Sequence, residues 1–535
     1  MSINKQSYEN LLENLRVGNS IAEKDLLLEA ARVETPVFLG VLNDDYDIIL
    51  GRKGAGKTAI FRLIGSMSPF LLGKNIVVLS GVNSTGESIF TQYKEKFKEF
   101  SQEEFENFWK LYILSLIYNQ FIKDPFFSDK LTAFEKEIGD FKNECSKAGV
   151  PNIPAQLSRE QILEWVMNLF RNIKGIKKVK LPLAVTVPNQ ATIFSASPEI
   201  EFKSKEMDQL EQQAIYVHNI GKALANLLKN SGFKLWIILD RLDEVFQRYS
   251  KIEFCGLRGL LLAYKSFDID ESSDIFRIKL FLRDDIKSFL TDSTIYKKHF
   301  KNEIPALPAA THIFAKESPT LSWNEDEIQQ LILNRLILNN KLIRDYLGIT
   351  DKYSMTNPSK LDEVLKNELR DKHVRLEYWN KIFPKKISSS DSLKWIFTRL
   401  KDSNDVVTPR SVIDMLEGAI SYLKRKIQTN FEDSVTIFPV DSIIEGLKTA
   451  SKYKLEKDVY NEFPKEQEAI KKLSSFGKYK LKGKDLEKLF GNKWREIVED
   501  LKRIGIIKYI IYSKEYSIAY IFRPAMGISY KNYTG

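Results

Sequence analysis

Eight residues near the start of the chain, 51 to 58, follow the pattern G-x-x-x-x-G-K-T. Its glycines allow consecutive backbone amides to curl around an anion that side chains would otherwise block. A helix predicted to begin near Lys57 adds the positive end of its dipole. Lys57 can reach the outer phosphates, and the Thr58 hydroxyl can ligate magnesium. The pattern therefore predicts a polyphosphate site, with contacts from Gly51, Arg52, Lys53, Gly54, Ala55, Gly56, Lys57, Thr58 and Ala59.

A second acidic motif follows an apolar run in FKLWIILDRLDEVF, Phe233 to Phe246. Such a run indicates a parallel strand that is buried on both faces, and ligands of parallel sheets collect at the carboxyl ends of the strands. Asp240 ends the run, so we expect it to hold magnesium beside Thr58. Asp243 and Glu244 follow, where a carboxylate can orient or deprotonate an attacking water.

A third motif, IFRIKLFLRDDI, predicts a strand that ends at Arg283. Arg283 is placed to sense the γ-phosphate or to pair with the acidic residues of the second motif, and the sequence also leaves a structural salt bridge open. The segments DYDIILG and KNIVVLSG read as further buried strands. Together they predict an α/β fold with a parallel sheet flanked by helices.

Composition limits the classes of protein that fit. The 535 residues suggest several domains, and 43% hydrophobic and 12% aromatic residues suit a folded chain. A net charge of +10 is small for this length and supports nucleic-acid binding only weakly. Cys145 and Cys255 lack the spacing of a metal site. The sequence shows neither a secretory signal nor an apolar run long enough to cross a membrane, so we expect a cytoplasmic protein.

The three motifs together resemble bacterial AAA+ and STAND P-loop ATPases. LSWNEDEIQQLILNRL, Leu321 to Leu336, is similar to the helix that opens the lid of these proteins, and VVTPRSVIDMLEGA, Val406 to Ala419, is similar to their sensor-2 region. The resemblance implies ATP and Mg²⁺ as ligands, whereas the residues alone do not distinguish ATP from GTP. It also implies that Asp240 is the magnesium carboxylate, Asp243 or Glu244 the base, Arg283 the first sensor and Arg410 the second.

Two departures from the family pattern stand out. Arg241 follows Asp240 where many AAA+ proteins have the catalytic Glu, so the base stays open between Asp243 and Glu244. About 180 residues separate the first two motifs, more than one crossover needs, which predicts an insertion.

Arg258 and Arg335 are candidate arginine fingers that would act across a subunit interface.

The predicted organisation has four parts. Residues 1–45 form an N-terminal helical segment, including SIAEKDLLLEAARV, which should pack on the nucleotide-binding domain. Residues 46–318 form that domain, with a helical and β-hairpin insertion at about 84–206. Residues 319–430 form a helical lid, and residues 431–535 form a winged-helix-like domain, because a helix, a short strand, two helices and a hairpin follow one another there.

The last predicted helix before the hairpin could enter the major groove of DNA, with Lys493, Arg495, Lys502 and Arg503 facing the DNA. Three carboxylates lie on the same helix and would oppose binding to phosphates. A partner protein is therefore as good a candidate ligand as DNA.

The main hypothesis is a magnesium-dependent ATPase that acts as a nucleotide-driven switch or motor. It would act as a homo-oligomer or with a partner protein, and bacterial genome defence is a contextual association. The alternative is a DNA-binding regulator that holds a nucleotide with little turnover. A small-molecule kinase fits less well, because it gives the lid and C-terminal domain no role.

Overall fold

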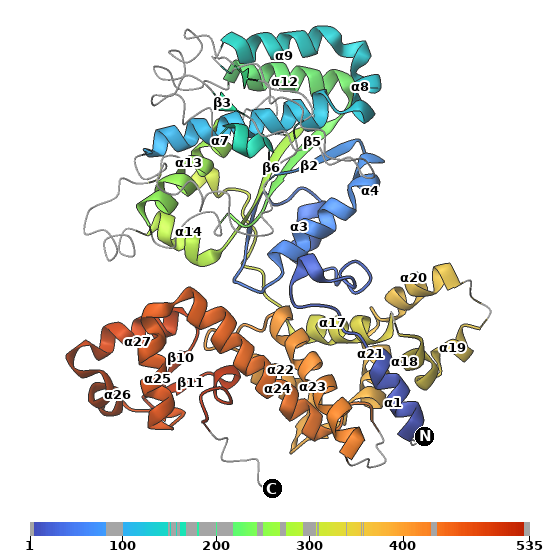
Figure 1. Ribbon diagram of the computed structural model, residues 1–535, viewed down its shortest axis with the longest axis vertical. Helices are drawn as coiled ribbons and strands as arrows, with labels where there is room; N and C mark the ends of the chain where they lie inside the picture. The colour runs from blue at the N-terminus through green and yellow to red at the C-terminus, as the bar shows by residue number, and fades with distance from the viewer. Residues whose placement is uncertain are drawn as a thin grey trace. The chain divides into compact units, whose positions relative to one another are not determined.

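The computed structural model describes residues 5–81, 100–147, 150, 157, 161–166, 179–180, 199–200, 218–242, 250–267, 274–292, 307, 310–338, 340–354, 356, 358–429 and 436–528 (Figure 1). The chain divides into two compact units. One comprises Met1–Pro36, Lys53–Ala59 and Leu321–Gly535, and the other comprises Val37–Arg52 and Ile60–Thr320. The division into four domains stays a prediction, because the two units do not test it.

A four-stranded parallel sheet lies at the centre of the second unit. Its order is β1-β6-β5-β2, where β1 is Ile48–Leu50, β6 is Phe276–Leu282, β5 is Lys234–Leu239 and β2 is Ile76–Ser80. Every residue of β6 is buried, and so is every residue of β5 except the first. Strands buried on both faces carry continuous apolar runs, which is why the sequence predicts all four. The predicted α/β fold with a parallel sheet is confirmed.

Helices cover both faces of this sheet (Figure 1). On one face α7 (Gln102–Ile117) packs against α13 (Lys251–Phe267), and the Trp109 indole donates a hydrogen bond to the Gly256 carbonyl at 2.9 Å. On the other face α3 (Lys57–Ser66) contacts β6, where the Phe61 and Phe281 rings meet edge to face at 5.8 Å. Because helices cover both faces of the sheet, a ligand would reach the sheet at the ends of its strands.

Shorter elements complete the second unit. They are α2 (Pro36–Leu42), α4 (Ser68–Leu72), η2 (Tyr118–Ile122), α8 (Pro125–Leu131), η3 (Thr132–Phe134), α9 (Glu135–Lys147), α12 (His218–Ser231), α14 (Asp284–Thr291) and α16 (Ala310–Ile313). Two short strands, β3 (Val179–Lys180) and β4 (Glu199–Ile200), pair antiparallel. Most of the hairpin predicted around them lies outside the described residues.

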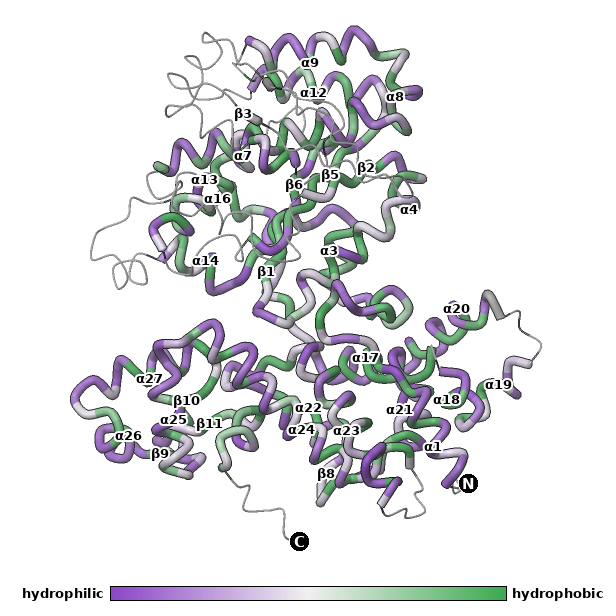
Figure 2. The backbone as a smooth tube through the Cα atoms, viewed as in Figure 1, coloured by the Kyte–Doolittle hydropathy of each residue, from purple (hydrophilic) through white to green (hydrophobic). Residues whose placement is uncertain are grey.

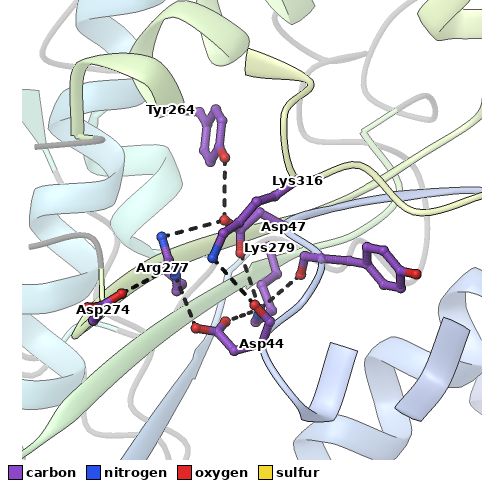
Figure 3. A network of polar contacts seen from close by, with 8 residues as sticks. Asp44, Asp47, Tyr264, Asp274, Arg277, Lys279 and Lys316 are labelled. Carbon is purple, nitrogen blue, oxygen red and sulfur yellow. Dashed lines mark hydrogen bonds and ion pairs between the residues drawn. The ribbon is translucent and has the colours of Figure 1, made fainter. Parts of the chain in front are cut away.

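A network of charges lies just before β1 (Figure 3). It is on the face of the sheet that also carries Trp236. The Lys279 ammonium, fully buried, donates to Asp44 at 2.6 Å, to the Tyr46 carbonyl at 2.9 Å and to Asp47 at 3.2 Å. The Arg277 guanidinium donates to Asp44 at 3.1 Å. Burial raises the pKa of Asp47, and the two cations oppose that shift. The network ties the start of β1 to β6.

The first unit is helical. It contains α1 (Lys5–Asn14), η1 (Ala22–Lys24), α17 (Glu325–Ile337), α18 (Lys341–Tyr346), α19 (Ile349–Lys352), α20 (Pro358–Glu368), α21 (Lys372–Ile382), β7 (Lys386–Ile387), β8 (Ser390–Asp391), α22 (Ser392–Leu400), α23 (Pro409–Thr429), α24 (Val440–Tyr453), η5 (Lys454–Tyr460) and η6 (Pro464–Glu466). Hydrophilic and hydrophobic stretches alternate along these helices (Figure 2), and the longer ones bury one side in a common core. α17 begins inside the predicted lid-opening segment, and α23 begins at the predicted Pro-Arg pair.

The N-terminal segment differs from its prediction in its local structure. SIAEKDLLLEAARV forms a short 3-10 helix and turns rather than a regular helix, because the Asp25 carboxylate accepts hydrogen bonds from the Asn19 and Leu27 amides and pairs with Arg335 at 2.7 Å. The segment also belongs to the unit of residues 321–535, where the Tyr8 hydroxyl donates to the Ile437 carbonyl at 2.7 Å. This unit also includes loop residues 53–59, and packing of the segment on the nucleotide-binding domain stays a prediction.

The C-terminal elements follow the predicted order. They are α25 (Gln467–Phe476), β9 (Lys480–Leu481), α26 (Gly483–Phe490), η7 (Gly491–Lys493), α27 (Trp494–Arg503), β10 (Ile507–Ile510), β11 (Glu515–Ile518) and η8 (Tyr520–Phe522). The three strands form an antiparallel sheet in the order β10-β11-β9.

Candidate functional site

The glycine-rich loop connects β1 to α3, as the sequence predicts. The Gly51 amide donates to the Leu282 carbonyl at 3.2 Å, which continues the pairing of β1 with β6 by one residue. Gly54 and Gly56 have φ angles of +76° and +110°, which other residues rarely adopt. The helix begins at Lys57, so its unpaired amide groups lie at the end of the loop. The local structure is therefore a strand, a loop and a helix start, a geometry that is suited to binding an anion.

The carboxyl edge of the sheet collects the start of this loop and two other predicted residues. Leu50 is in register with Leu282, and Leu239 with Leu280. Gly51, Arg283 and Asp240 each follow directly after their strands, so all three lie at the same edge, with β6 between β1 and β5. The Asp240 side chain is buried. This edge is where parallel sheets bind their ligands.

The two predicted base residues, Asp243 and Glu244, lie outside the described residues. The chain before them turns sharply, because Arg241 has a φ of +57°. That left-handed conformation is uncommon for a residue with a side chain. The strand ends at Leu239, directly before Asp240.

Arg283 forms a structural ion pair, one of the three roles that the sequence leaves open. Its guanidinium donates to both carboxylate oxygens of Asp285, at 3.0 Å and 3.1 Å. Arg283 is buried and immediately precedes α14. The planar fork of arginine suits this two-bond geometry. A contact with a phosphate stays a prediction for this residue.

The cations at the tip of the loop face carboxylates. Arg52 lies 3.4 Å from Asp284. The Lys53 ammonium lies 2.6 Å from Glu462 and 3.8 Å from Asp458. Their positive charge is therefore balanced by acidic neighbours in this conformation.

Arg410, predicted to act as a second sensor, lies against the loop. A methyl group built on Gly54 would stand 3.2 Å from Arg410 Cβ and 3.6 Å from Thr408 Oγ1. The Arg410 guanidinium donates to Asp458 Oδ1 at 2.9 Å. Loop residues 53–59 and Arg410 thus belong to one compact unit. Within this unit the arginine pairs with the Asp458 carboxylate.

Trp323, Asp458 and Glu462 contact the loop or its neighbours, and sequence reasoning missed all three. The Trp323 indole donates to the Ala55 carbonyl at 2.7 Å and lies beside Gly56. Its one sequence signal is its place directly before Asn324, which caps α17. Asp458 and Glu462 occur in a stretch of mixed charges that resembles a solvated surface.

The two candidate arginine fingers are buried. Arg335 is 3% exposed and donates to the Val17 carbonyl as well as to Asp25. Arg258 is 1% exposed and lies over the Phe254 ring. A finger must reach another subunit, so the fingers predicted at these positions are wrong for this conformation.

The buried carboxyl of Asp414, one helical turn after Arg410, gives a pH-dependent prediction. Burial raises its pKa to about 6, against opposing effects of Ser20 and Arg410. The folded state therefore holds this proton more tightly than the unfolded state, so stability should fall as the pH rises from about 4 to about 6, by about 2 to 3 kcal/mol at most. We expect Asp414→Asn to remove this loss, and urea unfolding at pH 4.5 and pH 7.5 measures it. Asp405→Asn, at an exposed carboxylate, is the control and should unfold like the wild type at both values.

Comparisons with known proteins place few limits on the chain. No family model matches it. A putative transposon gamma-delta 80.3 kDa protein of Escherichia coli is 22% identical over 298 residues, which cover 54% of this chain but only 36% of that protein. The chain thus matches about a third of this relative's length.

Two solved structures of the ORC2 protein of Aeropyrum pernix align along nearly all of the chain. The form with ADPNP and ADP has 11% identity, a TM-score of 0.36 and 97% of each chain covered. The ADP form has 10% identity, a TM-score of 0.30 and covers 98% of this chain and 97% of its own. Similarity this low supports no inference about function. Within the described residues, no helix is both long and apolar enough to span a membrane.

Proposed function

We propose that the chain is a magnesium-dependent ATPase of the AAA+ class. The observation that carries the proposal is the loop from Gly51 to Lys57, which has two glycines in left-handed backbone conformations and opens a helix. Its first residue lies at the sheet edge that also holds Asp240. A bare anion site would not need a buried carboxylate at that edge, whereas a phosphate chain with its divalent ion would.

Each residue has a role in this proposal. Lys57 binds the outer phosphates, and the backbone amides of residues 51–59 surround them. Thr58 and Asp240 hold magnesium, which when bound supplies positive charge against the phosphate oxygens. Asp243 or Glu244 orients and deprotonates the attacking water. Arg283 and Arg410 stabilise the charge that develops on the transferring group.

The finer parts of the proposal concern the output. The chain acts as a nucleotide-driven switch or motor in the cytoplasm, as a homo-oligomer or with a partner protein, and is similar to STAND members of the class. Its resemblance to ATPases in defence-gene neighbourhoods suggests bacterial genome defence as the setting. We interpret α25 to β11 as a winged helix, because the order helix, strand, two helices and hairpin, with a three-stranded antiparallel sheet, fits that motif.

Asp240→Asn tests the assignment of the second motif. The variant keeps the shape of the side chain and removes its charge, so we expect binding of ADPNP close to that of the wild type and hydrolysis of ATP about 100-fold slower. Phosphate release with magnesium, and with EDTA, measures the effect. Hydrolysis that is unchanged in Asp240→Asn would contradict the magnesium role.

A DNA-binding regulator with little turnover is a second candidate. Residues 464–528 contain 15 Lys and Arg against 8 Asp and Glu, so this segment concentrates the basic excess of the chain. Tyr512, at the tip between β10 and β11, is fully exposed. Against this, α27 carries Glu496, Glu499 and Asp500, which would repel phosphates.

Binding to labelled duplex DNA separates the two candidates. A regulator should bind DNA with an affinity that falls steeply between 50 and 200 mM salt and that survives substitution of Lys57, while turning over ATP slowly or not at all. An ATPase should hydrolyse ATP with magnesium whether or not it binds DNA. The same purified protein serves for both measurements.

A further inference from the structure

Two carboxylates shortly before α25 contact Arg410, which the proposed function assigns to the nucleotide, and Lys53, which lies in the proposed phosphate-binding loop. Asp458, in η5, accepts from Arg410 at 2.9 Å, and Glu462, two residues after η5, lies 2.6 Å from Lys53. We call Asp458 and Glu462 the acidic clamp. We propose that the acidic clamp competes with the triphosphate for Arg410 and Lys53, so that ATP binding releases the clamp and changes how the segment 454–462 is held.

Burial makes these ion pairs more than surface contacts. The Asp458 side chain is 8% exposed and that of Glu462 is 14% exposed, whereas Lys53 and Arg410 retain 32% and 28% exposure. Asp458 also lies 3.5 Å from Lys454 and 3.8 Å from Lys53. A carboxylate that is largely withdrawn from water depends on such partners. If Arg410 bound another anion in place of Asp458, the position of the Asp458 side chain would therefore be less stable.

The geometry brings the competing anion to the same place. Arg410 runs along the loop, with its Cβ 3.2 Å and its Cδ 3.6 Å from a methyl group built on Gly54. Lys53 precedes that glycine. A triphosphate in the loop would add several negative charges beside both cations, and it would repel two carboxylates in the same space. Arg410 can bind the triphosphate if its guanidinium exchanges Asp458 for a phosphate oxygen.

The position of the clamp in the chain gives the exchange a consequence. Asp458 belongs to a π-helix, a geometry found often at functional sites. The π-helix directly continues α24 and is followed by η6 and α25, the first helix of the C-terminal segment. Release of the clamp would thus connect the nucleotide state of the loop to the chain entering the C-terminal domain. This inference depends on the proposed function, since it requires nucleotide binding at the loop.

Affinity for ADPNP, measured by calorimetry on the full chain, tests the competition. We expect Asp458→Asn and Glu462→Gln each to bind ADPNP more tightly than the wild type, and the double variant about tenfold more tightly. In an Arg410→Met background, Asp458→Asn should change the affinity by less than about twofold, because the cation for which Asp458 and the nucleotide compete is gone. The control is Asp405→Asn, which removes an exposed carboxylate that pairs with Lys508, and it should bind like the wild type.

A second measurement follows the clamp itself. Hydrogen exchange of the amides in 454–462 should accelerate when the wild type binds ADPNP, and should be fast without nucleotide in the double variant. If the wild type binds ADPNP but Asp458→Asn and Glu462→Gln bind it equally or more weakly, the clamp proposal is wrong and the ATPase proposal stands. If the wild type does not bind ADPNP, both are wrong. If Asp458→Asn fails to fold, Glu462→Gln alone tests the proposal.

Discussion

Lys57→Ala should lower magnesium-dependent ATP hydrolysis about 100- to 1000-fold, the usual cost of removing one group that stabilises transition-state charge. Lys57 opens α3 directly after the two left-handed glycines, and its side chain is largely buried at 9% exposure. A lysine held at this place contributes a point charge to the outer phosphates. Alanine keeps the helix, so the loss should be one of binding and turnover rather than of folding.

Arg62→Ala is the matched control for this prediction. Arg62 is exposed on the same helix, so the variant removes one cation from α3 without touching the loop. Phosphate release and ADPNP affinity should stay near wild type in Arg62→Ala and fall sharply in Lys57→Ala, while both variants keep the circular dichroism spectrum of the wild type. Full hydrolysis by Lys57→Ala would remove the central residue of the proposed function.

Elements whose local sequence and burial agree were predictable. The four strands are apolar runs, and the loop between β1 and α3 requires glycine at positions that the spacing alone reveals. Pro409 fixes the start of α23 because proline is favoured in the first turn of a helix. The order of the C-terminal elements was also readable. In each of these cases a few neighbouring residues decide the structure.

Contacts between distant residues were not predictable. Asp25 and Arg335 are 310 positions apart, yet their buried pair keeps the N-terminal segment out of a regular helix. Asp458 reaches Arg410 across 48 positions. A charged residue reads the same in a sequence whether it is solvated or buried with a partner. Long-range ion pairs therefore account for the corrected arginine finger at Arg335 and for the acidic clamp.

Lys279→Met should destabilise the chain by about 3 to 5 kcal/mol, because removal of one partner leaves buried charges uncompensated. The Lys279 ammonium contacts Asp44 and Asp47 (Figure 3). It also lies 4.4 Å from the centre of the Trp236 ring. Methionine keeps the length of the side chain, so the packing on Trp236 changes little. The loss should therefore come from the stranded carboxylates. Urea unfolding followed by circular dichroism measures it.

A second substitution separates charge from packing. If the stranded charge is the cause, Lys279→Met combined with Asp47→Asn should recover part of the lost stability, since the buried site then holds one charge fewer. Lys287→Met is the control: Lys287 pairs with Glu317 but is 27% exposed, so its loss should cost less than about 1 kcal/mol. Equal unfolding of Lys279→Met and the wild type would show that the network is not needed for stability. Because the network joins the start of β1 to β6, and the loop begins where β1 ends, we also expect a Lys279→Met chain that remains folded to bind ADPNP more weakly.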